Sequence, residues 1–179
     1  MSAAPSNADR QRQVLFVCTG NVCRSPMAEY LLRARLDPAA GWSVSSAGLA
    51  ALPGLPASAE AVAALGERGL DLRPHRSRPL TAEQIDAATL IVVMTTLHLA
   101  QIRLDNPAAV EKTFLLKTFD PRGGGLDVDD PIGLTLDAYR QTRDEIERAL
   151  PGLLAFMETL NLEYGVRDEN GDRGGSRRI

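Results

Sequence analysis

The sequence has few of the features that mark secreted, membrane-spanning or nucleic-acid-binding proteins. Only two of its 179 residues are cysteine, which is too few for the disulfide framework of a small secreted domain. No apolar run is long enough to span a bilayer. Lys and Arg number 20 against 23 Asp and Glu, so no basic excess points to nucleic acid or to an anionic membrane surface. The natural reading is a reducing cytoplasm.

The two ends of the chain differ from its middle. Residues 1–12 are polar and contain no apolar segment of the kind found in a secretory signal, so they predict a flexible leader. Residues 164–179 are rich in Gly, Arg and Asp and predict a disordered tail. Residues 13–163 show no internal repeat and no second boundary, and they suffice for one domain with an ordinary core.

Apolar runs alternate along the chain with segments of helical periodicity. The runs predict strands over residues 14–18, 42–46, 89–94 and 113–116. The periodic segments predict helices over residues 26–36, 58–68, 81–86, 96–104 and 135–162, with Pro151 as a potential break in the last one. Strands that are apolar on both faces fit the middle of a parallel sheet. The pattern therefore predicts a single-domain α/β fold: a doubly wound, four-stranded parallel sheet with helices on both faces.

The first predicted strand ends at a cysteine that is followed by a short loop. The loop contains Gly20 and Asn21, the residue types that most easily adopt positive φ, so its N–H groups can point inward. Such a loop at the start of a helix binds anions, and the carboxyl ends of parallel strands are where α/β sheets bind ligands. Cys18 is thereby delivered to a phosphate-sized anion site.

The helix that follows this loop is expected to begin at Ser25 and Pro26, with Ser25 as the N-cap and Pro26 in the first turn. Arg24 lies six residues after Cys18 and can hold two phosphate oxygens with its planar fork. The field that binds phosphate also favours the thiolate form of a cysteine over the thiol. The segment thus combines a nucleophile with a fixed positive charge.

These residues resemble the low-molecular-weight protein tyrosine phosphatase family from about Gln13 to Leu162. The resemblance is strongest over residues 18–29, which read CTGNVCRSPMAE as in bacterial members. Further segments appear in the family's order: VSSAG at 44–48, HRSR at 75–78, IVVMT at 91–95 and DDP at 129–131. A collinear set of five segments is far more specific than the loop alone.

The resemblance implies a cysteine-dependent phosphomonoesterase, a protein-tyrosine-phosphatase that works through a phosphocysteine intermediate without a metal or another cofactor. Its partner would be a phosphorylated protein, with no role for nucleic acid or membrane. Cys18 would attack phosphorus, and Arg24 would hold the oxygens. The phosphate-binding loop would comprise Thr19, Gly20, Asn21, Val22, Cys23 and Ser25.

This chemistry also needs an acid that protonates the leaving group. Two Asp-Pro pairs are available, Asp120-Pro121 and Asp130-Pro131, and the residues alone do not choose between them because either could be a plain turn. The resemblance selects Asp130, since the family carries its acid in an Asp-Pro that precedes the last helix.

The resemblance also implies a supporting role for residues outside the loop. Ser25 would donate a hydrogen bond to the thiolate, and Ser46 and His75 would hold Asn21 in a strained conformation. Cys23 has two open interpretations. It either traps Cys18 in a reversible disulfide, as in the family, or it only packs in the core.

The substrate class has its own alternatives. The protein-arginine-phosphatase branch shares the segment Asp130-Pro131-Ile132-Gly133, but it carries threonine where this chain has Val22. The pocket wall is expected at Leu49, Leu52 and Ile132. Arsenate reductase is less favoured because the chain has no cysteine after Cys23. A non-catalytic phosphate-binding module is disfavoured by the joint presence of nucleophile, arginine and acid.

Overall fold

A computed structural model describes the chain from residue 11 to residue 170, with side chains to residue 161. Four strands form one parallel sheet in the order β2-β1-β3-β4. Their bounds are Arg12–Cys18 for β1, Trp42–Gly48 for β2, Leu90–Val93 for β3 and Thr113–Leu115 for β4. The predicted strands and their parallel arrangement are confirmed.

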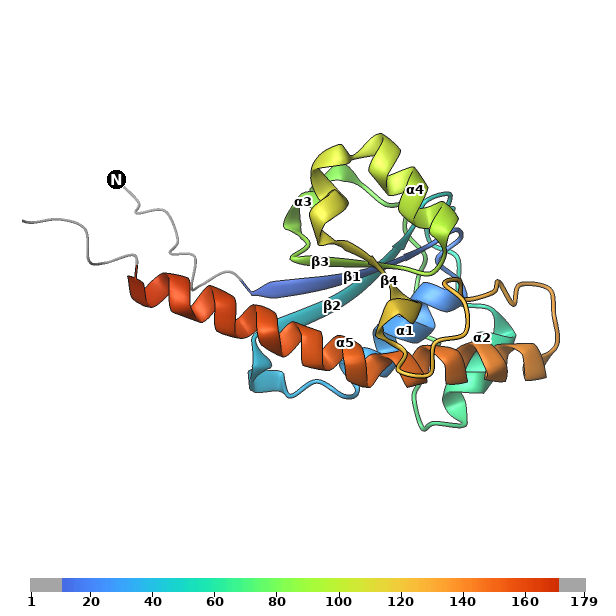
Figure 1. Cartoon of the computed structure of the whole chain (residues 1–179). Coiled ribbons are helices and arrows are strands. Elements are labelled where there is room, and N and C mark those ends of the chain that lie inside the picture. Colours follow the sequence, from blue (N-terminus) through green and yellow to red (C-terminus); the bar gives the residue numbers. More distant parts are fainter. Residues whose placement is uncertain (1–10, 171–179) are drawn as a thin grey trace, which may run out of the picture.

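Helices cover both faces of this sheet (Figure 1). On one face lie α3 (Ala82–Ala87) and α4 (Thr96–Asp105); on the other lie α1 (Arg24–Arg33), α2 (Ala59–Gly66) and α5 (Leu136–Asn170). Short 3₁₀ turns connect the elements at Pro38–Ala40 (η2), Pro107–Lys112 (η3) and Leu116–Phe119 (η4). None of the helices between residues 11 and 170 combines the length and apolarity needed to cross a bilayer.

The central strand β1 feeds two separate cores because successive side chains point to opposite faces of a sheet. Val14 and Phe16 enter the core beneath α1, α2 and α5. Leu15 and Val17 enter the core on the α3 and α4 side. All four side chains are fully buried. This is why the run reads as continuously apolar, and it holds the end of β1 rigidly in the middle of the molecule.

The start of α1 differs from the prediction. The helix begins at Arg24 with Cys23 as its N-cap residue, and no side chain caps it. The amide N–H of Met27 already donates to the carbonyl of Cys23 at 3.2 Å, so the first turn forms before Ser25. The expectation that Ser25 caps the helix is wrong. Its hydroxyl is used elsewhere, as described below.

The last helix is longer than predicted. α5 runs without interruption from Leu136 to Asn170, so the predicted end at 162 is wrong, while the disorder of residues 164–179 stays a prediction. Residues 171–179, the remainder of the predicted tail, and residues 1–10 of the predicted leader lie outside the described residues. Pro151 does not break the helix. It is exposed, so water can hydrate the carbonyl that loses its partner there.

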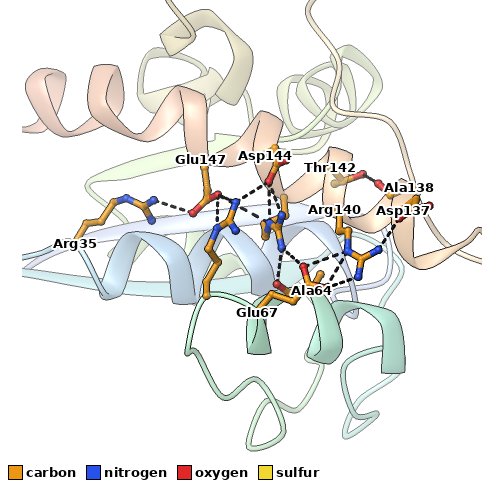
Figure 2. A network of polar contacts seen from close by, with 11 residues as sticks. Arg35, Ala64, Glu67, Asp137, Ala138, Arg140, Thr142, Asp144 and Glu147 are labelled. Carbon is orange, nitrogen blue, oxygen red and sulfur yellow. Dashed lines mark hydrogen bonds and ion pairs between the residues drawn. The ribbon is translucent and has the colours of Figure 1, made fainter.

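Ion pairs fasten α5 to α2 (Figure 2). Glu67, directly after α2, accepts hydrogen bonds from Arg140 and Arg143 of α5, and the bonds from these arginines lower the pKa of Glu67 to about 2. The buried Arg143 also donates to the carbonyl of Ala64 at 2.9 Å. Arg68 pairs with two further α5 carboxylates, those of Asp144 and Glu147. The network fixes the position of α2 along α5.

Gly152 of α5 and Gly66, the last residue of α2, are helical glycines with very different surroundings. A Cβ at Gly152 would lie 2.3 Å from the carbonyl oxygen of Phe119, whereas a Cβ at Gly66 would meet nothing within 4 Å. We expect Gly152→Ala to destabilise the fold by about 1–3 kcal/mol through overpacking. Gly66→Ala, the matched control, should leave stability unchanged or raise it by up to about 1 kcal/mol. Urea unfolding measures both, and equal midpoints for the two variants would contradict the packing argument.

Candidate active site

The loop of residues 18–23, here named the nucleophile loop, joins β1 to α1. Cys18 is the last residue of β1 and lies in register with Gly48 of β2. A Cβ at Gly48 would stand 2.5 Å from the carbonyl oxygen of Thr19 and 3.0 Å from the amide nitrogen of Asn21. The end of β2 must therefore be glycine for the loop backbone to pass this closely.

Asn21 is the conformational centre of the loop. It is the sole non-glycine residue with positive φ, 54°, in the part of the chain that the structure describes. Its side-chain oxygen accepts from the amide N–H of Arg78 at 2.9 Å. Its carbonyl accepts from Nε2 of His75 at 2.8 Å, so Nε2 carries the proton of that ring. Burial lowers the pKa of His75, which keeps the ring neutral at pH 7.

The remaining hydrogen bonds of Asn21 set the direction of a network that ends at Cys18. The amide group of Asn21 donates to both Ser25 and Ser46, each at 2.9 Å. Each serine therefore keeps its own hydrogen for another acceptor. Ser46 donates to the carboxylate of Glu29 at 2.5 Å. Ser25 lies 2.9 Å from Sγ of Cys18, while its alternative acceptor, a backbone carbonyl, is at 3.4 Å. The network thus offers Cys18 a donated hydrogen bond, which suits a thiolate.

Arg24 supplies a buried cation directly after this loop. Its side chain is 4% exposed, and Nη1 donates to the carbonyl of Val128 at 3.1 Å. Nη2 pairs with the carboxylate of Asp130 at 2.8 Å. Nε is buried and has no hydrogen-bond partner. A buried N–H without an acceptor costs free energy, so the site favours an anion that can accept from it.

The structure separates the two Asp-Pro pairs that the sequence left equivalent. Asp130 lies on the loop of residues 120–133, here named the acid loop, where it pairs with Arg24 and remains 42% exposed on its side chain. Asp120 is 1% exposed on its side chain and pairs with Arg148 of α5 at 3.3 Å. Asp130 is therefore next to the nucleophile loop, and Asp120 holds the base of the acid loop to the last helix.

Cys23 makes contacts on the side of the core. Its Sγ lies 3.2 Å from the hydroxyl of the fully buried Tyr139 and 3.4 Å from that of Ser58. Burial raises the pKa of the Cys23 thiol. Both cysteines are free thiols in the structure. These contacts fit the packing interpretation, and a reversible disulfide with Cys18 stays a prediction.

The other predicted residues are placed as follows. Val22 is half-buried against the larger core, and Gly20 does not adopt positive φ, so that part of the loop prediction is wrong. Leu49 packs against the core on the α3 and α4 side. Leu52 and Ile132 are 68% and 53% exposed, and their part in a pocket wall stays a prediction. Thr19 is exposed beside Cys18.

His98 and Glu29 were missed at the sequence level. His98, in the first turn of α4, places Nε2 2.9 Å from the hydroxyl of Thr19. Glu29 of α1 is 6% exposed and ends the branch of the network that passes through Ser46. His98 belongs to no motif that would have singled it out, and Glu29 ends the segment of residues 18–29 without any signal of its contact with Ser46. Within residues 11–161, whose side chains the structure describes, no cluster of His, Cys, Asp and Glu could hold a metal ion.

Comparisons with known proteins agree on one family. A family model described as low molecular weight phosphotyrosine protein phosphatase matches residues 13–164. A protein-arginine-phosphatase of Geobacillus stearothermophilus is 43% identical over 147 residues, which cover 82% of this chain and 97% of that protein. The low molecular weight protein-tyrosine-phosphatase Etp of Escherichia coli is 38% identical over 136 residues, which cover 76% and 88%.

Solved structures of similar phosphatases also match this chain. The YwlE arginine phosphatase from Geobacillus stearothermophilus matches with a TM-score of 0.76 at 42% identity, over 85% of this chain and 96% of that one. A low molecular weight protein tyrosine phosphatase from T. tengcongensis matches with a TM-score of 0.74 at 39% identity, over 80% and 98%.

The direction of the Asn21 network can be tested without a substrate. Asn21→Asp keeps the size of the side chain but cannot donate to Ser25, so Cys18 loses the oriented hydrogen bond and gains a nearby negative charge. A hydrogen bond to a charged group contributes about 1.5–3 kcal/mol, so alkylation of Cys18 at neutral pH should slow by about 10-fold or more. Iodoacetamide labelling followed by mass spectrometry measures the rate at Cys18.

Asn106→Asp is the matched control, because it adds the same charge at the N-cap of η3, where the side chain makes no capping bond. It should alkylate like the unmodified chain. Equal rates for both variants would contradict the proposed direction of the network.

Proposed function

This chain belongs to the low molecular weight phosphotyrosine protein phosphatase family, and we propose that it hydrolyses phosphotyrosine in proteins. The observation that carries the proposal of a phosphate site is the buried Arg24, whose Nε has no acceptor. Arg24 directly follows the nucleophile loop, whose first residue, Cys18, has its Sγ 2.9 Å from the hydroxyl of Ser25. These observations support a binding site for an anion at one end of the nucleophile loop and a nucleophile at the other.

In the first step, the thiolate of Cys18 forms a bond to phosphorus while the bond from phosphorus to the tyrosine oxygen breaks. Arg24 and the N–H groups at the start of α1 bind the phosphoryl oxygens, whose charge is greatest in the transition state. Asp130 gives its proton to the departing phenolate oxygen, so that neutral tyrosine leaves. The product of this step is phosphocysteine.

In the second step, water attacks phosphorus and the bond from phosphorus to Cys18 breaks. Asp130, now ionised, accepts a proton from the water, which returns the carboxyl group to its starting form. The thiolate is regenerated, and its hydrogen bond from Ser25 stabilises it as a leaving group. Inorganic phosphate is released, and no metal or cofactor enters the cycle.

The preference for phosphotyrosine rests on Val22 of the nucleophile loop. When its methyl groups pack against phenyl carbons, no hydrogen-bonding group is buried without a partner. A phosphoguanidinium would leave N–H groups unpaired there, which costs about 1–3 kcal/mol for each buried group. Leu49, Leu52 and Ile132 would form the apolar wall around the ring.

Phosphoarginine is the second candidate because specific observations favour it. Relatives named protein-arginine-phosphatase are 43% and 42% identical to this chain, against 38% for Etp. Ile132 and Gly133 follow the acid where the resemblance places aromatic residues in tyrosine-specific members, so one wall is thinner. We therefore expect kcat/KM to be only modestly higher for phosphotyrosine than for phosphoarginine. We also infer that the enzyme acts in a reducing cytoplasm, where Cys18 is protected from oxidation.

The nucleophile is tested by Cys18→Ser. A serine hydroxyl stays protonated where the thiolate forms, so turnover of p-nitrophenyl phosphate should disappear. Phosphate binding, measured by calorimetry, should survive because Arg24 and the loop amides remain. Arg24→Lys should also be nearly inactive, since an ammonium group cannot reproduce the planar fork. Measurable turnover by pure Cys18→Ser protein would refute the mechanism.

The acid is tested by comparing the two Asp-Pro pairs. Asp130→Ala should slow the first step by about 10²–10⁴-fold on phosphates with poor leaving groups, and the loss should shrink when the phenolate leaves unaided. Asp120→Ala should instead lower stability, because it removes the buried partner of Arg148. A series of aryl phosphates measures the dependence on the leaving group. A dependence that changes in Asp120→Ala and not in Asp130→Ala would reverse the assignment.

The substrate preference is tested by kcat/KM on matched phosphotyrosine and phosphoarginine proteins. Val22→Thr adds a hydroxyl that can accept from the guanidinium, so it should move the preference toward phosphoarginine by about 10-fold, the value of one hydrogen bond. Val62→Thr, a half-buried valine of α2, is the control and should leave the ratio unchanged. A preference for phosphoarginine above tenfold in the unmodified enzyme would replace the phosphotyrosine proposal.

A further inference from the structure

The first turn of α4 contacts both catalytic loops, although none of its residues enters the mechanism above. Its link to the nucleophile loop is His98, whose Nε2 lies 2.9 Å from the hydroxyl of Thr19. Thr19 directly follows Cys18 and is exposed, whereas His98 is 6% exposed. A buried ring on a helix therefore holds an exposed hydroxyl next to the nucleophile.

The link from α4 to the acid loop is made by Thr96. Its amide N–H and its hydroxyl both donate to the carboxylate of Asp127, at 2.7 and 3.2 Å. Nearby, the amide N–H of Val128 donates to the carbonyl of Met94 at 2.8 Å, just before the helix begins. Asp127 lies three residues before Asp130, so this link fixes the segment of the acid loop that leads to Asp130.

The turn that carries both links is itself well defined. Thr95 is the N-cap residue of α4, and its hydroxyl accepts from the amide N–H of His98 at 3.2 Å. The same bond satisfies one of the unpaired N–H groups at the helix start and fixes the position of His98 in the turn. Thr96 and His98 are therefore held at a constant separation.

We propose that His98 is a positioning residue of the phosphatase reaction, and that the first turn of α4 sets the distance between the nucleophile loop and the acid loop. His98 anchors the nucleophile loop through Thr19, and Thr96 anchors the acid loop through Asp127. The inference rests on the proposed function, because the distance matters only if Cys18 and Asp130 act on the same substrate. An effective first step needs both groups within about 3–3.5 Å of the reacting atoms.

The ring acts through a hydrogen bond and not through charge. Burial and the nearby Arg24 lower the pKa of His98 to about 4, so the ring is neutral at pH 7. A neutral ring has one N–H and one acceptor nitrogen. Nε2 contacts Thr19, and Nδ1 is buried without a partner. Leaving Nδ1 unpaired costs free energy, and a residue chosen only for packing would avoid that cost.

The two links predict different defects, which is the basis of the test. Thr19→Val and His98→Leu release the nucleophile loop, so each should weaken binding of inorganic phosphate about 5-fold or more and lower kcat/KM on p-nitrophenyl phosphate about 10-fold. The dependence on the leaving group should not change in either variant. Asp127→Ala releases the acid loop, so it should steepen that dependence and leave phosphate affinity unchanged.

Three further variants make the result decisive. His98→Gln can still reach Thr19 with its amide and should restore most of the activity that His98→Leu loses. The double variant Thr19→Val/His98→Leu should be no worse than either single variant, because both remove the same bond. Leu97→Ala, on the same helix turn and 78% exposed, is the control and should behave like the unmodified enzyme. Calorimetry measures phosphate binding in every variant.

Thr19→Val changes an exposed residue, so it tests the link even if His98→Leu does not fold. Unchanged phosphate affinity and turnover in Thr19→Val would overturn the role of His98, and additive losses in the double variant would do the same. If the unmodified enzyme turns over p-nitrophenyl phosphate and Thr19→Val matches it, the inference fails while the proposed function stands. If the unmodified enzyme shows no turnover, the proposed function fails.

Discussion

The site depends on one residue held in a left-handed conformation, Asn21. Its backbone turns the nucleophile loop back toward α1, and such a conformation is costly for a residue with a Cβ unless its surroundings impose it. Here four groups impose it: the imidazole of His75, the amide of Arg78 and the hydroxyls of Ser25 and Ser46. Two of these bonds also orient the serines, so the contacts that hold the loop are the ones that prepare the nucleophile. The conformation of the nucleophile loop and the hydrogen bonding of Cys18 therefore both depend on the side chain of Asn21.

The doubly wound sheet explains why these groups can meet. β1 is buried on both faces, so its carboxyl end cannot shift without disturbing two cores. β2 brings Ser46 and Gly48 alongside it, and β3 leads directly into α4 and His98. Residues far apart in the sequence thus converge at the carboxyl edge of adjacent parallel strands, as the topology of open α/β sheets requires. The long helix α5 and its ion pairs with α2 support the opposite end of the nucleophile loop, through Tyr139 and its contact with Cys23.

Much of this arrangement could be predicted from local sequence, and the failures have physical causes. The strands, their parallel direction and the strand–loop–helix around Cys18 follow from apolar runs and from a Gly-Asn loop, which are local signals. Ser25 was assigned to a helix cap because serine favours caps, but a stronger demand, the hydrogen bond to Cys18, takes its hydroxyl. The residues alone did not choose between Asp130 and Asp120, and only the resemblance selected Asp130, because the contact that separates them is with Arg24, 106 residues earlier in the chain. The proposed role of His98 could not be predicted for the same reason, because it depends on a contact with Thr19, which is distant in the sequence.

The pairing of Arg24 with Asp130 suggests an order of events during catalysis. Arg24 is almost fully buried and is fixed by the carbonyl of Val128, whereas Asp130 is 42% exposed and sits on a glycine-rich loop. When a phosphate dianion binds, it competes with Asp130 for the guanidinium, and the exposed partner is the one that can move. In the proposed mechanism, this displacement frees the carboxylate of Asp130 to take up a proton from solvent, and this is the proton that the first step transfers to the leaving oxygen. The ion pair therefore keeps the acid at the site until the substrate itself releases it, and Arg24 is not required to change its position.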